Sequence, residues 1–173
     1  MKTERLVNIS LFAVITFISG FIRIDLGPVP ITMQTLAVNF TALMLNPIDA
    51  AITMGLNLLL KLILNPGGGI LSPSFGFLLG FILAASLGSL YLYKKGTGRK
   101  NIIIAIVIAS LIPYFIGLPY MAYIIIGING VEMSLMGIIE TGFLIFIPGD
   151  LLKAGLAYVI GNKLLKIYPK MKN

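Results

Sequence analysis

Long apolar stretches, separated by short polar or proline- and glycine-rich breaks, occupy most of the chain. Several of them reach the roughly 17–25 residues that a helix needs to cross a membrane. The run 101–112 shows none of the alternation between apolar and polar residues that is typical of a transmembrane β-strand. Helices are therefore expected, and the pattern predicts six of them: over about 6–24, 32–45, 50–64, 75–93, from 101 onward, and 148–167.

The breaks between these stretches carry a prediction of their own. The segments 23–31 and 65–74 are rich in proline and glycine and fall on the same side of the predicted bundle. Irregular backbone at membrane depth persists only where it is buried in protein or lines a cavity. We therefore expect both segments to fold inward and to help form a pocket on the outer side.

Two regions near the end of the chain are less regular. Pro113 and Pro119 fall inside the fifth predicted helix, so that helix is expected to kink or to end at one of them. The stretch 127–141 is less apolar and contains Glu132 and Glu140. We expect a loop with a short interfacial helix there.

The composition indicates which solvent surrounds the chain. Hydrophobic residues make up 58% of its 173 residues and charged residues 11%, whereas a soluble domain carries about 25% charged residues. The sequence thus predicts an all-α, multi-pass membrane protein in contact with lipid, with a single domain over residues 1–173. Its first apolar stretch follows a basic start but lacks a small-residue cleavage site, so we interpret it as a spanning helix rather than a signal peptide.

The basic residues predict the orientation. The net charge is +7, and ten of the thirteen basic residues fall in three clusters beside apolar stretches. With six helices, all three clusters lie on one side, and basic excess beside short loops marks the cytoplasmic side. We therefore expect both termini in the cytoplasm and no binding of nucleic acid. The clusters are Lys2 and Arg5; Lys94, Lys95, Arg99 and Lys100; and Lys163, Lys166, Lys170 and Lys172.

Charged side chains inside spanning helices are costly and mark candidate functional sites. Asn57, Lys61 and Asn65 follow one another at four-residue spacing and form a polar stripe on the third helix. Asp150 and Lys153 lie on one face of the last helix near its outer end. Together with further polar residues of the outer half, they predict a pocket for a small, polar, anionic ligand; these residues are Arg23, Thr32, Gln34, Thr35 and Asn39.

Each of these features also has a structural interpretation. Asp150 and Lys153 are able to neutralise each other and fix the last helix. Lys61 is close enough to a helix end to extend to the lipid headgroups, and Arg23 and Asp25 are able to form a solvated pair. A stripe of small residues on the fourth helix either packs within the bundle or contacts a partner protein; it consists of Gly76, Gly80, Ala84 and Gly88.

Several activities are excluded by what the sequence lacks. It contains no cysteine and no histidine, which excludes thiol chemistry and imidazole acid–base catalysis and makes a zinc site improbable. It has no phosphate-binding GxxxxGK[ST] motif, no paired-carboxylate motif and no internal repeat. We expect a binding protein that is not an enzyme and needs no cofactor.

Three segments resemble the signatures of one family. Residues 27–36, GPVPITMQTL, closely resemble the GPVPITLQTL signature of the BioY biotin transporters. Residues 72–81, SPSFGFLLGF, are similar to the family's GPTGGYLLGF, and residues 146–154, FIPGDLLKA, resemble its FIPGDLLKA. The three segments occur in the family's order and span most of the chain.

The resemblance implies a six-helix bundle like that of the substrate-binding S components of energy-coupling factor (ECF) transporters. It implies an outward-facing biotin site covered by the loop after the first helix, in a prokaryotic plasma membrane. Uptake would be powered by a coupling membrane subunit and two ATP-binding subunits. The family's polar pair corresponds to Asp150 and Lys153, and its glutamine in the second helix corresponds to Gln34. In this hypothesis Asp150 accepts hydrogen bonds from the ureido N–H groups, and Lys153 or Lys61 pairs with the carboxylate.

The third helix departs from the family pattern. Asn57 and Lys61 stand where the family usually has a tyrosine and a glycine. Two alternatives therefore stay open: an S component for another vitamin or small anion, and, from a different class, an intramembrane enzyme acting on a lipid phosphate.

Overall fold

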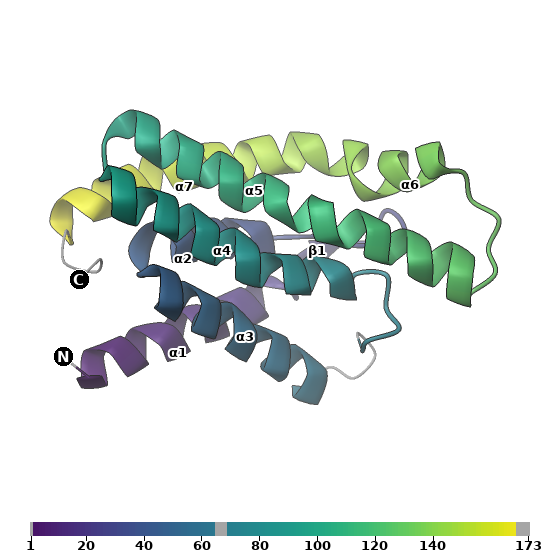
Figure 1. Cartoon of the computed structure of the whole chain (residues 1–173), viewed down its shortest axis with the longest axis horizontal. Coiled ribbons are helices and arrows are strands. Elements are labelled where there is room, and N and C mark those ends of the chain that lie inside the picture. The colour runs from purple at the N-terminus through teal and green to yellow at the C-terminus, as the bar shows by residue number, and fades with distance from the viewer. Residues whose placement is uncertain (1, 65–68, 169–173) are drawn as a thin grey trace.

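The computed structural model of the protein describes residues 2–64 and 69–168. Within these residues, long helices form a bundle and a small hairpin lies beside it (Figure 1). The elements in chain order are α1 (Lys2–Ser19), β1 (Arg23–Ile24), β2 (Ile31–Thr32), α2 (Gln34–Met44), α3 (Pro47–Leu64), α4 (Phe75–Lys95), α5 (Arg99–Ala122), the π-helix η2 (Tyr123–Ile128), α6 (Leu135–Gly142), the 3₁₀-helix η3 (Leu144–Phe146) and α7 (Ile147–Ile167).

Five long helices, together with the shorter α2 and α6, confirm the predicted all-α bundle in the described part of the chain. Four stretches there are long and apolar enough to cross a membrane: Pro47–Leu64, Phe75–Lys95, Arg99–Ile128 and Leu135–Ile167. Helix α2 has 11 residues and is only about 16 Å long. It lies in the middle of the bundle, packed against α4, α5 and α7. Its polar side chains therefore face protein, where they are able to find partners.

The end of the first helix differs from the prediction. Helix α1 ends at Ser19 rather than at position 24, and Arg23 and Ile24 form β1 instead. This strand pairs antiparallel with β2, with Arg23 opposite Thr32, and the backbone of Met33 donates to the carbonyl of Ile22 at 3.1 Å. The segment leaves the helix because the distant strand satisfies its backbone groups. The second helix correspondingly begins at Gln34, after Thr32, and not at Thr32.

The third helix begins earlier than predicted, at Pro47. Proline suits the first turn of a helix because its missing N–H would have no partner there. The side chain of Asn46 accepts a hydrogen bond from the backbone N–H of Asp49 at 2.9 Å and so caps the new start.

Helix α5 passes both of its prolines without ending. It continues to Ala122 and then widens into η2. Of the two predicted alternatives, a kink or an end at one of the prolines, the end is therefore wrong. A proline removes one backbone hydrogen bond, but a break at membrane depth would leave several backbone groups without partners. The predicted short helix in 127–141 is confirmed as α6. The side chain of Ser134, the N-cap residue just before it, accepts a hydrogen bond from Gly137 N.

The small residues of α4 pack the bundle together. A Cβ atom added at Gly80 would lie 2.7 Å from the Cα of Pro113, and one added at Gly76 would lie 2.3 Å from the Cβ of Tyr120. Helices α4 and α5 thus approach closely along the stripe, and this confirms the packing interpretation. In return, Gly117 of α5 makes room for the ring of Phe77.

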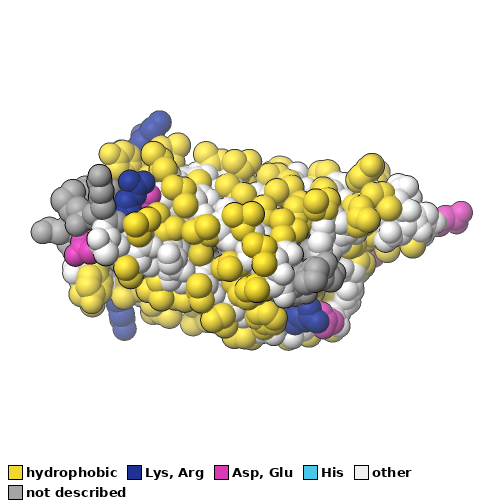
Figure 2. Space-filling view, turned by 90° about the horizontal axis from the view of Figure 1, so that it is seen from below, with side chains coloured by type: hydrophobic (Ala, Val, Ile, Leu, Met, Phe, Trp, Pro, Cys, Tyr) yellow, Lys and Arg dark blue, Asp and Glu magenta, His cyan; other side chains and the backbone are white. Residues whose placement is uncertain are grey.

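Charged and apolar side chains are separated along the bundle. The N- and C-terminal ends of the chain lie at the same end, together with the turn between α4 and α5 (Figure 1). Charged side chains gather at the ends, and hydrophobic side chains cover the middle of the face shown in Figure 2. Apolar side chains such as Phe115 and Leu152 are more than two-thirds exposed. This arrangement fits a protein surrounded by lipid around its middle.

Candidate functional site

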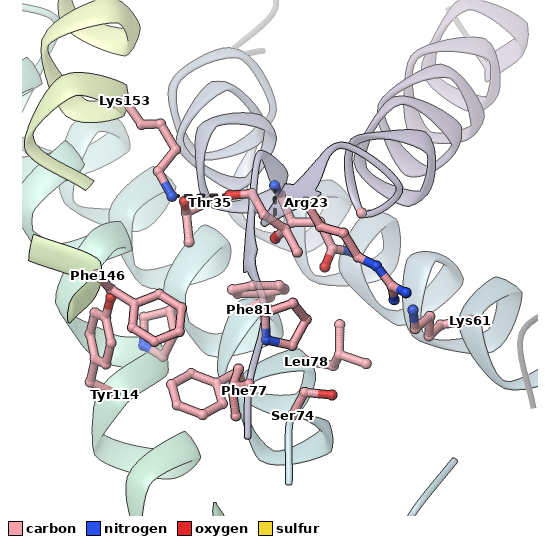
Figure 3. Close-up of a pocket in the computed structure, with 16 residues that line it drawn as sticks. Arg23, Thr35, Lys61, Ser74, Phe77, Leu78, Phe81, Tyr114, Phe146 and Lys153 are labelled. Atoms are coloured by element: carbon pink, nitrogen blue, oxygen red, sulfur yellow. Dashed lines mark hydrogen bonds between the residues drawn. The ribbon is translucent and has the colours of Figure 1, made fainter. Parts of the chain in front are cut away.

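A cavity lies between the hairpin and helices α2, α3, α4, α5 and α7. The space between its lining atoms amounts to about 650 Å³, a figure that includes open solvent at the mouth of the cavity. Figure 3 shows the side chains that point into it. The lining residues are Gly20, Arg23, Val29, Pro30, Thr32, Gln34, Thr35, Lys61, Ser74, Phe77, Leu78, Phe81, Pro113, Tyr114, Phe146 and Lys153.

One end of the cavity is formed by a polar cluster around Asp150. The ammonium of Lys153 lies 2.6 Å from one carboxylate oxygen, Oδ1, and Thr35 donates to that same oxygen at 3.3 Å. The hydroxyl of Tyr114 donates to the other oxygen, Oδ2. Lys153 also donates to the backbone carbonyl of Thr32 at 3.0 Å. The cluster therefore joins α2, α5, α7 and β2 at one point.

The burial of this cluster fits its pairing. The side chains of Lys153 and Asp150 are 6% and 13% exposed. A buried charge is tolerated only when it is paired and hydrogen-bonded, and Asp150 has three such partners. About four acceptor positions are available on a carboxylate, so one is left for a ligand.

Aromatic rings form the wall next to the polar cluster. Phe77 and Tyr114 meet edge-to-face with centroids 5.8 Å apart, and Phe77 stacks on Phe146 at 6.5 Å. Phe81 lines the same wall. Such a wall holds a compact apolar ring system, while the polar cluster is placed to orient it.

The opposite end of the cavity is basic. Arg23 comes from β1 and Lys61 from the last turn of α3, and their charged groups point toward one another (Figure 3). Arg23 also lies 3.4 Å from Asp25, with both side chains about half exposed or more. An exposed pair of this kind holds its partners weakly.

Two side chains in the described residues have buried polar atoms without a hydrogen-bond partner. They are Gln34, through Nε2, and Asn57, through both amide atoms. An unpaired buried group of this kind costs about 1–3 kcal/mol. Gln34 lines the cavity, and its buried Nε2 has no partner within the described protein.

The cavity gathers most of the predicted site residues. Arg23, Thr32, Gln34, Lys61 and Lys153 line it. Asp150 lies directly behind the lining, bonded to three residues that do. Asn57 is fully buried in α3 but does not line the cavity, and Asn65 lies outside the described residues.

The structure also tests the plainer interpretations. Lys61 lines the cavity instead of extending only toward headgroups. Asp150 and Lys153 do neutralise each other, but they do so at the cavity wall. The segment 23–31 folds inward as predicted, since Arg23, Val29 and Pro30 are part of the lining, and Ser74 contributes from the second break.

Sequence reasoning missed Tyr114 and the aromatic wall. A signal for Tyr114 was present, because Ser110 and Tyr114 are spaced i, i+4 in an otherwise apolar helix. Both face polar partners across the bundle: Ser110 exchanges hydrogen bonds with Asn39, at 3.1 and 3.4 Å, and Tyr114 bonds Asp150. The phenylalanines offered no such signal, since they fall within apolar runs.

Residues 1–170 match the model of the BioY family. The chain belongs to the BioY family. A probable biotin transporter BioY from Lysinibacillus sphaericus is 29% identical over 176 residues, covering 96% of this chain and 89% of the relative. A biotin transporter BioY from Rhizobium etli is 32% identical over 189 residues, covering 98% and 97%.

The fold also matches that of a solved structure. A crystal structure at 2.1 Å of the S-component for biotin from an ECF-type ABC transporter has a TM-score of 0.80 and 25% identity, covering 95% of this chain and 92% of that one. The bundle described above is thus an S-component fold.

The three BioY-like segments meet at the cavity. Segment 27–36 supplies Val29, Pro30, Thr32, Gln34 and Thr35 to the lining. Segment 72–81 supplies Ser74, Phe77, Leu78 and Phe81, and segment 146–154 supplies Phe146 and Lys153. Segments far apart in the sequence therefore form one site.

Proposed function

We propose that this chain is the biotin-binding S component of an ECF-type importer and captures biotin in the cavity described above. The observation that carries the proposal is the convergence of the three BioY-like segments on one cavity. That cavity combines a fixed polar end with an aromatic wall, as a ligand with a polar ring and an apolar body requires. Its family and its structural neighbour point to the same ligand.

The polar end suits the ureido ring of biotin. Nε2 of Gln34 is a donor without a partner in the protein, and in this proposal it donates to the ureido carbonyl. The remaining acceptor position of Asp150, directly behind the lining, accepts from a ureido N–H. Phe77, Phe81 and Phe146 then enclose the sulfur-containing ring. Thr32, which lines the cavity, and Asn57 complete the proposed set of binding residues. Asn57 does not line the cavity, and its inclusion rests only on its buried amide without a partner.

The proposal includes a partner and an orientation. An S component works with an energising module, here taken to be a coupling membrane subunit and two ATP-binding subunits. Both termini and the α4–α5 turn lie at one end of the bundle (Figure 1), and the three basic clusters of the sequence belong to these regions. Basic excess marks the cytoplasmic side, so the cavity faces outward in the cell membrane.

Calorimetric titration of the detergent-purified protein with biotin tests the proposal, with thiamine and riboflavin as controls. We expect one-to-one binding of biotin alone. Asp150→Asn should weaken it by at least tenfold, since a hydrogen bond to a charged group contributes about 1.5–3 kcal/mol. Asp49→Asn is the matched control, because Asp49 is also largely buried (6% exposed, against 13% for Asp150) but its side-chain partners, Arg5 and Asn46, are not part of the cavity lining.

The outcomes separate the alternatives. Saturation with thiamine or riboflavin instead of biotin would favour an S component for another vitamin, with α3 as the altered wall. No binding heat with any of the three vitamins, together with turnover of a lipid phosphate, would favour the intramembrane enzyme. The family assignment argues against that second outcome, because the relatives are named as biotin transporters.

A further inference from the structure

The two ends of the cavity differ in how their charges are balanced. Three cationic side chains line it, Arg23, Lys61 and Lys153, and no acidic side chain of the described residues does. Lys153 is balanced, since it pairs with Asp150 at 2.6 Å and donates to Thr32 at 3.0 Å. Its charge is paired, and two of its three N–H donors are already used within the protein.

The basic end is not balanced. Among the described residues, no carboxylate lies within ion-pair distance of Lys61, and Asp25 is the single carboxylate beside Arg23, at 3.4 Å. Arg23 and Lys61 together therefore exceed Asp25 by one positive charge. Like charges that face each other in a partly enclosed site repel, and an anion between them removes the repulsion.

The charged groups of Arg23 and Lys61 have different shapes, and the two shapes complement each other in binding a carboxylate. The guanidinium of Arg23 presents a planar fork that matches a carboxylate, and the ammonium of Lys61 supplies a point charge. They come from separate elements, β1 and α3, and point toward one another at the cavity (Figure 3). Asp25 is 64% exposed, so it competes only weakly for Arg23.

We propose that Arg23 and Lys61 form a carboxylate clamp that binds the anionic tail of the ligand, and that Lys153 does not bind it. The inference rests on the proposed function and assigns the orientation of the ligand in that site. The ring lies at the Asp150 end and the carboxylate lies at the Arg23–Lys61 end. One of the two clamp residues, Lys61, belongs to α3, the helix that departs from the family pattern.

Comparison of biotin with its primary amide, biotinamide, tests the clamp, because the two ligands share the ring and differ only in the charge of the tail. The unaltered protein should bind biotin about tenfold to a hundredfold more tightly than biotinamide, as expected for a charge-assisted hydrogen bond. Arg23→Gln with Lys61→Met should abolish this preference and leave the affinity for biotinamide within about twofold. Lys95→Gln with Arg99→Gln is the matched control, since both residues lie outside the cavity, and it should keep the preference.

A third variant tests the competing carboxylate. Asp25→Asn removes the one acid beside the clamp and should tighten the binding of biotin by severalfold, with biotinamide unchanged. If the double variant does not purify in a folded form, the single variants Arg23→Gln and Lys61→Met are compared in the same way, and each should lose part of the preference.

Several results would overturn the clamp. Equal binding of the two ligands by the unaltered protein would show that the carboxylate is not recognised. A preference that survives in the double variant, or that disappears in Lys153→Met alone, would place the carboxylate at the other end. If the double variant lost bound phosphatidylglycerol while its affinities for biotin and biotinamide stayed unchanged, Arg23 and Lys61 would be assigned to a lipid headgroup instead. Failure of the unaltered protein to bind either ligand would refute the proposed function, and the clamp with it.

Discussion

The ammonium group of Lys153 lies 3.0 Å from the backbone carbonyl oxygen of Thr32, 121 positions earlier in the chain. This bond ties α7 to the second strand of the hairpin at the wall of the cavity. Since Lys153 also pairs with Asp150, one side chain holds both the position of the hairpin and the charge of the polar cluster. Ligand binding and local stability are therefore coupled at this residue.

The first prediction concerns the loss of that side chain. Lys153→Met leaves the carboxylate of Asp150 buried without its cation, so it should lower the stability by about 3 kcal/mol and weaken biotin binding. Thermal unfolding in detergent measures the first effect. Adding Asp150→Asn to the same chain should recover much of the stability without recovering binding. A double variant no more stable than Lys153→Met would contradict this coupling.

The second prediction separates the hydroxyl of Tyr114 from its ring. Tyr114→Phe removes the hydrogen bond to Asp150 and keeps the aromatic wall, so biotin affinity should fall by about tenfold. Tyr114→Ala should weaken binding further, because it also opens the wall. Tyr123→Phe is the control, since Tyr123 is 64% exposed on η2. Unaltered affinity in Tyr114→Phe would show that the hydroxyl does not position Asp150.

The third prediction concerns the close approach of α4 and α5. Gly80→Ala should destabilise the protein by about 1–3 kcal/mol, because the added methyl group would lie 2.7 Å from the backbone of Pro113. Gly55→Ala makes the same change in α3 where nothing lies within 4 Å. That control should gain about 0.5–1 kcal/mol, since alanine favours the helix. Equal effects of the two substitutions would refute the packing argument.

The fourth prediction concerns the opposite end of the bundle. Asp49 is buried, accepts a hydrogen bond from Asn46 at 2.8 Å and pairs with Arg5 of α1. Asp49→Ala should lower the unfolding temperature more than Arg5→Gln does, because the carboxylate holds two partners and the exposed guanidinium holds one. Biotin affinity should stay unchanged in both, which calorimetry would show. Weaker binding in either variant would mean that this end communicates with the cavity.

The helices could be predicted because their signal is local. A run of apolar residues long enough to cross a membrane can be recognised in a window of about 20 residues. The hairpin could not be predicted in this way, since positions 20–24 are as apolar as the helix before them. Only their pairing with β2 decides the end of α1. The local preference of proline favours a break in α5 at Pro113. The helix continues there because of the surrounding bundle, which the sequence window does not contain.

The candidate site shows the same division. Asp150, Lys153 and Lys61 could be selected from the sequence because a charge in an apolar run is conspicuous. Tyr114 and the phenylalanines are inconspicuous in such runs, and only the fold shows that they surround Asp150 and the cavity. Asn57 illustrates the opposite case: it belongs to the predicted polar stripe, but its direction on α3 keeps it out of the lining.

The hairpin and the seam between α4 and α5 give the cavity walls of unequal stiffness. The seam is packed backbone to backbone, whereas the hairpin is held by a ladder of two residue pairs and by Lys153. With the proposed function, we therefore expect the side with the hairpin to yield when a ligand enters or leaves. The chain has no native thiol, and a Cβ added at Gly149 would lie 3.8 Å from Cγ2 of Ile31. A disulfide between cysteines at these two positions should slow biotin exchange until it is reduced; unchanged exchange would place the route elsewhere.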